Sequence, residues 1–197
     1  MAFESVPPLV LLHGLGTGPD AWQAQVEALA PTRVVLVPAL ALDVGFTVER
    51  EASRVWAGIE TPGAADLCGL SLGALVALRM ALDRPERVRR LVLCAGFASL
   101  PRRFRLLMAA LGLTARSPIR AVFREGRRFD VRRELSGLRT PALVLVGDRD
   151  RANLGLSRVL AAELPNAELR VISGGGHIAN LDAAEAFTQV LREFLDG

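Results

Sequence analysis

The sequence predicts an α/β fold: a mostly parallel, doubly wound sheet of about six strands with a short helical insertion at about 98–140, called the lid below. Short, continuous apolar runs alternate with segments of helical periodicity, as expected for parallel strands that are buried on both faces. The alternation stops once, between Ala98 and Thr140. We expect one domain over residues 1–197, because a chain of this length can bury most of its surface in one core.

The strand candidates are apolar along nearly their whole length: Leu9–Leu12, Val34–Val37, Asp66–Cys68, Leu91–Cys94, Ala142–Val146 and Leu169–Ile172. Helical patterns lie at about 20–30, 48–60, 72–84, 154–164 and 181–195. At the start of the last helix, Asp182 and Glu185 have the spacing of a capping box. In such a sheet, ligands bind beyond the carboxyl ends of the strands.

The lid carries two apolar stripes at helical spacing, one from Phe104 to Leu111 and one from Ile119 to Phe123, which predict two short amphipathic helices over the strand ends. Between Pro101 and Arg139 there are eleven arginines and three acidic residues, whereas the rest of the chain is net acidic. The chain has no lysine, so arginine on the lid is either a general solvated cation or a site for an anionic or carrier-linked substrate. Transient adsorption to anionic lipid through the first stripe is a further alternative.

Several functional classes are not expected. The basic lid has no stacking aromatic side chains of the kind that bind nucleic acid. No apolar run is long enough for stable membrane insertion, and residues 1–5 lack the basic start of a signal peptide, so we expect a cytoplasmic protein. Cys68 and Cys94 are expected to be buried free thiols. Two separated histidines and no cysteine cluster predict no metal and no cofactor.

The pentapeptide Gly69-Leu70-Ser71-Leu72-Gly73 lies between a predicted strand and an apolar helical run. A Gly-x-Ser-x-Gly sequence at a strand-to-helix junction is typical of a nucleophile elbow, a tight turn that exposes the serine hydroxyl at the sheet edge. The start of the helix and its free backbone amides can stabilise a developing negative charge there. Ser71 is therefore the candidate nucleophile.

A serine nucleophile needs a base, and the sequence has two histidines. His177 follows the last strand and three glycines, which would let the loop bring its imidazole toward Ser71. His13 follows the first strand, in His13-Gly14-Leu15-Gly16, and we expect it to have a structural hydrogen-bonding role. The glycine-flanked turn after His13 lets the backbone amide of Leu15 approach a substrate oxygen.

The acid that orients the base should also follow a strand. Asp148 and Asp150 both come directly after the fifth strand, and the sequence pattern alone leaves both as candidates. With either acid, the chain order is serine, aspartate, histidine, which is the order of one class of catalytic triad.

With these motifs the chain resembles the α/β-hydrolase superfamily, in its small, lidded, single-domain, esterase-like form. The resemblance rests on five motifs in family order: His13-Gly14-Leu15-Gly16, Gly69 to Gly73, Pro85-Glu86-Arg87-Val88, Pro141 to Asp150, and Gly176-His177. It implies that Ser71 is the nucleophile, His177 the base, Asp150 rather than Asp148 the acid, and the amides of Leu15 and Leu72 the oxyanion hole. In this chain the loop after the second predicted strand, residues 38–43, departs from the usual family pattern.

The resemblance implies a serine hydrolase that cleaves a carboxylic ester or thioester of a small to medium acyl substrate through an acyl-enzyme. The same triad is also compatible with C–C bond hydrolysis, acyl transfer or lyase-type proton abstraction, and the fold with a non-catalytic ligand-binding protein. Gly14, Phe97, Ile178 and Trp22 are the candidate pocket residues. A tryptophan within a first helix, such as Trp22, is more often part of the core.

Overall fold

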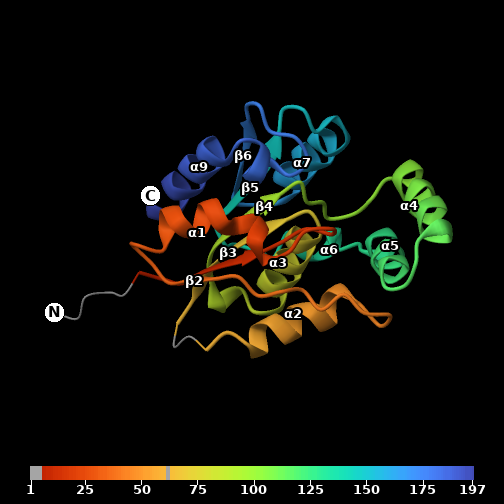
Figure 1. The fold of residues 1–197 in the computed structure, drawn as a ribbon, viewed down its shortest axis with the longest axis horizontal. Coiled ribbons are helices and arrows are strands. Elements are labelled where there is room, and N and C mark those ends of the chain that lie inside the picture. Colours follow the sequence, from red (N-terminus) through yellow and green to blue (C-terminus); the bar gives the residue numbers. More distant parts are fainter. Residues whose placement is uncertain (1–5, 61–62) are drawn as a thin grey trace.

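The structure is a computed structural model that describes residues 6–60 and 63–197. Within these residues, six strands form one sheet with the order β2-β1-β3-β4-β5-β6 (Figure 1), and every pair of neighbours is parallel. The strands are β1 (Leu9–Leu12), β2 (Val35–Leu36), β3 (Ala65–Leu70), β4 (Val88–Cys94), β5 (Ala142–Gly147) and β6 (Ala167–Ile172). The predicted parallel sheet is confirmed. Residues 1–5, where the sequence predicts no signal peptide, lie outside the described residues.

The helices of the body are α1 (Gln23–Leu29), α2 (Val48–Ala57), α3 (Leu72–Asp83), α7 (Arg151–Glu163), α8 (Ala179–Asp182) and α9 (Ala184–Asp196). Short 3-10 helices at Pro19–Trp22 and Pro85–Arg87 precede α1 and β4. Buried residues form one core cluster with α2, α3 and α7 and another with α1, α8 and α9. Residues of β1 alternate between the two clusters, so the sheet is covered on both faces and is doubly wound, as predicted.

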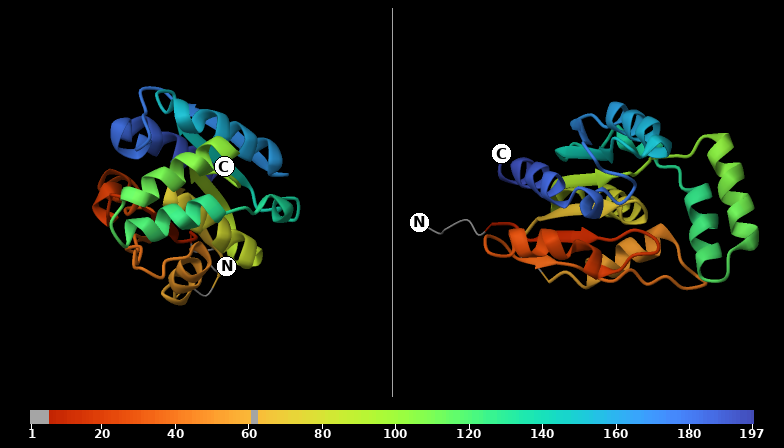
Figure 2. Two further views of the ribbon diagram at one scale, coloured as in Figure 1. Left: turned by 90° about the vertical axis from the view of Figure 1, so that its right-hand side faces the viewer. Right: turned by 45° about the horizontal axis from the view of Figure 1, so that its top comes forward.

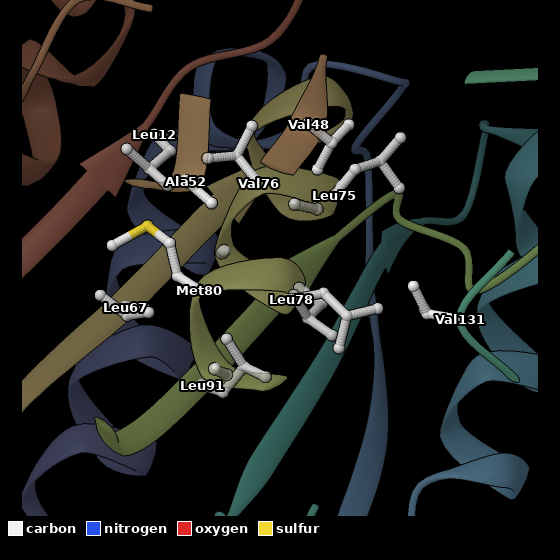
Figure 3. Packing of buried hydrophobic residues seen from close by; sticks show 14 of the residues in the cluster. Leu12, Val48, Ala52, Leu67, Leu75, Val76, Leu78, Met80, Leu91 and Val131 are labelled. Carbon is white, nitrogen blue, oxygen red and sulfur yellow. The ribbon is translucent and has the colours of Figure 1, made fainter. Parts of the chain in front are cut away.

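Helix α3, which begins directly after Ser71, is buried along most of its length. Val76 and Met80 pack in one cluster with Ala52 of α2 and with Leu67 and Leu91 of the strands beneath (Figure 3). A helix that is enclosed in this way cannot shift without disturbing the core. The position of Ser71 at its amino end is therefore fixed by packing.

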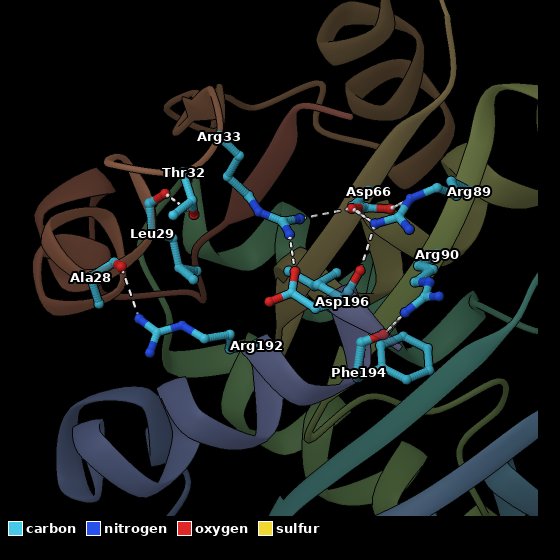
Figure 4. A network of polar contacts seen from close by, with 11 residues as sticks. Ala28, Leu29, Thr32, Arg33, Asp66, Arg89, Arg90, Arg192, Phe194 and Asp196 are labelled. Atoms are coloured by element: carbon cyan, nitrogen blue, oxygen red, sulfur yellow. Dashed lines mark hydrogen bonds and ion pairs between the residues drawn. The ribbon is translucent and has the colours of Figure 1, made fainter. Parts of the chain in front are cut away.

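An ion network lies at the amino edge of the sheet (Figure 4). The fully buried carboxylate of Asp66 pairs with Arg33 at 3.0 Å and with Arg89, and Arg33 also pairs with Asp196 of α9 at 2.6 Å. Burial raises the pKa of Asp66 above its ordinary value, although the arginines oppose this effect. The network fixes the end of α9 to the sheet, at the edge opposite to the carboxyl ends of the strands.

The lid contains α4 (Arg102–Thr114), α5 (Ile119–Arg128) and the short α6 (Arg132–Leu135). Figures 1 and 2 show α4 and α5 side by side beyond the carboxyl ends of the strands. The two predicted lid helices are thus present, and an antiparallel bridge between Ser99 and Asp130 joins the start of the lid to the segment between α5 and α6. No helix in the described part of the chain has the length and hydrophobicity needed to cross a bilayer.

The predicted capping box is wrong. The last helical segment is divided into α8 and α9, and Ala183, the residue before α9, makes no side-chain cap. The carboxylate of Asp182 instead accepts a hydrogen bond from the backbone N–H of Gly176 at 2.9 Å. Cys68 and Cys94 are buried free thiols, as predicted, and burial raises the pKa of both.

Candidate active site

Ser71 lies in a tight turn between β3 and α3, with φ 53° and ψ −112°. A Cβ atom added to Gly69 would lie 2.2 Å from the carbonyl oxygen of Gly73, and one added to Gly73 would lie 2.1 Å from that of Leu12. No side chain fits at either position, which explains why glycine flanks the serine on both sides. The N–H of Ser71 donates to the carbonyl of Cys94 at 2.8 Å, which connects the turn to β4.

The imidazole of His177 lies between Ser71 and Asp150. Its Nε2 is 3.1 Å from the Oγ of Ser71, and its Nδ1 is 2.8 Å from the Oδ2 of Asp150. An ionised carboxylate only accepts hydrogen bonds, so Nδ1 carries the proton and Nε2 can accept from the serine hydroxyl. The Asp150 carboxylate is buried, whereas Asp148 is exposed. Of the two candidate acids, the structure brings Asp150 to the histidine.

The glycine loop before His177 packs closely on the end of β5. A Cβ atom added to Gly147 would lie 2.2 Å from the carbonyl of Gly175, and the N–H of Arg149 donates to that carbonyl at 2.9 Å. Gly174 has φ 76°, a conformation that favours glycine. These contacts show that the glycines allow a close approach between two loops. This packing fixes the backbone of the loop that carries His177.

Asp150 also caps helix α7. Its Oδ1 accepts the backbone N–H of Asn153 at 3.2 Å, and the side-chain Nδ2 of Asn153 lies 2.9 Å from both carboxylate oxygens. Burial raises the pKa of Asp150, but the hydrogen bonds from His177 and Asn153 outweigh it, and the pKa lies below its ordinary value. Asn153 is not among the site residues predicted from the sequence. Its position three residues after a capping aspartate is the signal that points to it.

The two predicted oxyanion donors belong to residues close to Ser71. Leu72 is the first residue of α3, so its N–H has no partner within the helix. Gly14 lies against Ser71, since a Cβ atom added to Gly14 would be 3.5 Å from the Cβ of Ser71, and Leu15 is the next residue. Over residues 6–60 and 63–197, the N–H groups of Leu15 and Leu72 donate to no other protein group. Both N–H groups therefore have no protein acceptor in this part of the chain.

His13 has the structural environment that the sequence suggests. It is buried, its Nε2 accepts the N–H of Leu40 at 3.1 Å, and its Nδ1 lies 2.9 Å from the carbonyl of Gly14. Because Nε2 accepts, Nδ1 carries the proton and donates to Gly14. The imidazole thereby joins the loop after β1 to the loop after β2 and fixes the backbone next to Leu15.

The candidate pocket residues have different positions. Phe97 follows β4 and packs edge-on against Phe129 of the lid, with ring centroids 6.2 Å apart. Ile178, next to His177, is half-buried. Trp22 is fully buried and packs against Phe187 of α9, with centroids 5.8 Å apart, so its assignment to the pocket is wrong and it belongs to the core.

A cavity of about 370 Å³ lies where the lid joins the body. Leu100, Leu156 and Leu160 contribute apolar walls, and Arg102 and Arg105 of α4 contribute charge. In the described part of the chain, neither of these two arginines has an ion-pair partner. The lining also includes Arg132, which pairs with Asp130, and the acidic Glu163, so charges of both signs lie beside the apolar surface. The triad residues are not part of this lining.

The chain is similar to known hydrolases in sequence and in structure. The model of the alpha/beta hydrolase family matches residues 9–190. A pimeloyl-[acyl-carrier protein] methyl ester esterase of Aromatoleum aromaticum is 42% identical over 90 residues, which are 44% of this chain and 36% of that protein. A putative carbamate hydrolase RutD of Klebsiella pneumoniae is 28% identical over 246 positions, covering 98% of this chain and 92% of that protein.

The alignment with the Klebsiella protein has 246 positions, whereas this chain has 197 residues, so that relative contains segments that are absent here. Among solved structures, a hydrolase from Pseudomonas aeruginosa PA01 superposes with a TM-score of 0.83 over 100% of this chain and 92% of its own. Its sequence is 24% identical, and the similarity concerns the fold.

Proposed function

Because the chain belongs to the alpha/beta hydrolase family, we propose that this hydrolase cleaves a carboxylic ester or thioester of a small to medium acyl compound. The observation that carries the proposal is the continuous hydrogen-bonded series Ser71–His177–Asp150, with distances of 3.1 and 2.8 Å. A hydroxyl, an imidazole and a buried carboxylate in this order form the arrangement that activates a serine. The relatives are named as an esterase and a hydrolase, which favours an enzyme over a non-catalytic ligand-binding protein.

In the proposed reaction, His177 takes the proton of the Ser71 hydroxyl as Oγ attacks the carbonyl carbon of the substrate. Asp150 holds the imidazole in the tautomer that accepts this proton and stabilises the imidazolium that forms. The negative charge that develops on the carbonyl oxygen is bound by the N–H groups of Leu15 and Leu72. His177 then protonates the leaving group, and water releases the acyl group by the same steps.

We propose further that the substrate or its carrier is anionic. The lid carries eleven of the chain's arginines, and two of them face the cavity of about 370 Å³ without an ion-pair partner among the described residues. The relative from Aromatoleum aromaticum is named for an ester that is linked to an acyl-carrier protein. Arginine binds carboxylate and phosphate through two parallel hydrogen bonds, so a carrier-linked or carboxylate-bearing acyl group suits this surface.

A fluorophosphonate tests whether Ser71 is activated. We expect intact-mass measurement to show one covalent adduct on the wild type and none on Ser71→Ala or His177→Ala, because the reagent needs both the nucleophile and its base. A panel of p-nitrophenyl esters and acyl thioesters then identifies the substrate class. An adduct without ester or thioester turnover would favour C–C bond hydrolysis, acyl transfer or proton abstraction. Absence of an adduct on the wild type would contradict the proposal.

The lid arginines give a second test. Reversal of Arg102, Arg103 and Arg105 to glutamate is expected to raise the KM for an anionic acyl thioester by about tenfold, because favourable contacts are replaced by repulsion. The KM for a neutral ester of equal chain length should change by less than about twofold. The neutral ester is the internal control, since a folding defect would affect both substrates. Equal effects on the two substrates would show that the lid does not recognise charge.

A further inference from the structure

The side chain of Asn153 lies against both members of the acid–base pair. Its Nδ2 is 2.9 Å from Oδ1 of Asp150, 2.9 Å from Oδ2, and 3.2 Å from Nδ1 of His177. The same Oδ2 accepts the hydrogen bond from His177 at 2.8 Å. Asn153 and His177 therefore both direct donors at one carboxylate oxygen.

The chemistry of the groups fixes their roles. An amide nitrogen only donates, so Nδ2 of Asn153 cannot accept a hydrogen bond from the protonated Nδ1 of His177. A reversed amide would direct its oxygen at the carboxylate, which accepts only, and this would be repulsive. The short distance between Asn153 and His177 is thus the result of two donors converging on the Oδ2 of Asp150.

We propose that Asn153 is a positioning residue that fixes the Asp150 carboxylate and weakens its attraction for the His177 imidazolium by sharing Oδ2. This inference rests on the proposed roles of Ser71, His177 and Asp150. A hydrogen bond to Oδ2 neutralises part of its charge, so less charge remains to stabilise a proton on the imidazole.

The other polar and titratable groups near the pair belong to β4, to the loops after β3 and β5, and to α8. Cys94, at the end of β4, is a buried neutral thiol. Asp148 and Arg149 follow β5 and are exposed, and Arg149 extends toward Gly174. Asp182 of α8 accepts from Gly176, and Ser71 contacts Nε2. Within the described residues, only Asn153 and His177 donate to Oδ2 of Asp150.

The structure allows the side chain to be tested separately from the helix cap. The backbone N–H of residue 153 donates to Oδ1 of Asp150, and every substitution except proline retains this bond. Asn153→Leu keeps a similar volume but removes the two donors. Asn166→Leu is the matched control, because the exposed Asn166 amide makes one long contact of 3.4 Å with the carbonyl of Arg139 and precedes β6, at the opposite end of the strand from the His177 loop.

NMR of the histidine side chains provides a readout that needs no substrate. The chain has two histidines, so selective labelling gives the titration curve of His177, with His13 as an internal signal of the native fold. We expect Asn153→Leu to raise the titration midpoint of His177 by about one pH unit, and Asn166→Leu to leave it unchanged. The acid limb of the kcat/KM profile should move in the same direction.

Asn153→Ala covers the case in which the leucine variant fails to fold, because alanine is a good helix former and adds no bulk beside Asp150. It also removes the two side-chain donors and should raise the midpoint in the same direction as leucine does. An unchanged midpoint in the folded variants would overturn the role of Asn153. A raised midpoint in a protein without hydrolytic activity on any ester or thioester would retain that role and contradict the proposed function instead.

Discussion

Replacement of Ser71 by alanine is expected to lower kcat by about 10⁴-fold or more. The Oγ that is lost is the atom that bonds to the acyl carbon, and no other hydroxyl contacts the Nε2 of His177 within the described residues. Alanine keeps the Cβ atom, so the packing around Gly69 and Gly73 is retained. The Leu15 and Leu72 amides are also unaffected, so substrate affinity should change by less than about twofold.

Steady-state kinetics on the best ester of the panel, together with the thermal unfolding midpoint, measure this effect. Ser173→Ala is the matched control, because Ser173 is an exposed serine directly after β6 whose side chain makes no hydrogen bond in the described part of the chain. It should keep wild-type activity. Activity of Ser71→Ala above about one tenth of wild type would show that another group is the nucleophile.

The fold and the central part of the site are predictable because short-range geometry determines them. Gly69 and Gly73 are needed by a turn whose backbone atoms come within 2.2 Å of any added Cβ atom, so the pentapeptide indicates both the turn and the exposed Ser71. The apolar runs indicate buried parallel strands, because a strand that is covered on both faces has apolar side chains along nearly its whole length. Parallel strands bring their carboxyl ends to one edge, and this places His177 and Asp150 near Ser71.

Other features depend on contacts between distant segments, which the sequence pattern does not contain. Trp22 belongs to the core because helix α9 brings Phe187 against it, 165 positions along the chain. Asp182 does not cap α9, because its carboxylate instead accepts the N–H of Gly176. Asn153 acquires its position only when the loop of His177 packs on the end of β5. In each case the local pattern allows several partners, and tertiary packing selects one.

Asp150→Asn is expected to lower kcat by about 10⁴-fold, through the tautomer of His177. Two donors of Asn153, the backbone N–H at 3.2 Å and Nδ2 at 2.9 Å, converge on Oδ1 of Asp150. They would draw the single amide oxygen of the new asparagine to that position. Its NH₂ group would then occupy the position of Oδ2 and donate to Nδ1 of His177. The imidazole proton would move to Nε2, which could no longer accept the proton of Ser71.

Asp148→Asn is the matched control for this prediction, because the same change two residues away affects an exposed carboxylate that makes no side-chain contact with His177. Its kcat should remain within about twofold of wild type. The pKa of Asp150 lies below its ordinary value, so the wild-type carboxylate stays ionised across the neutral range and the comparison at pH 7 is between a charged and a neutral acceptor. Loss of activity in Asp148→Asn with retention in Asp150→Asn would reverse the assignment of the acid. A loss in Asp150→Asn alone, with an unchanged unfolding midpoint, would locate the effect in the orientation of His177.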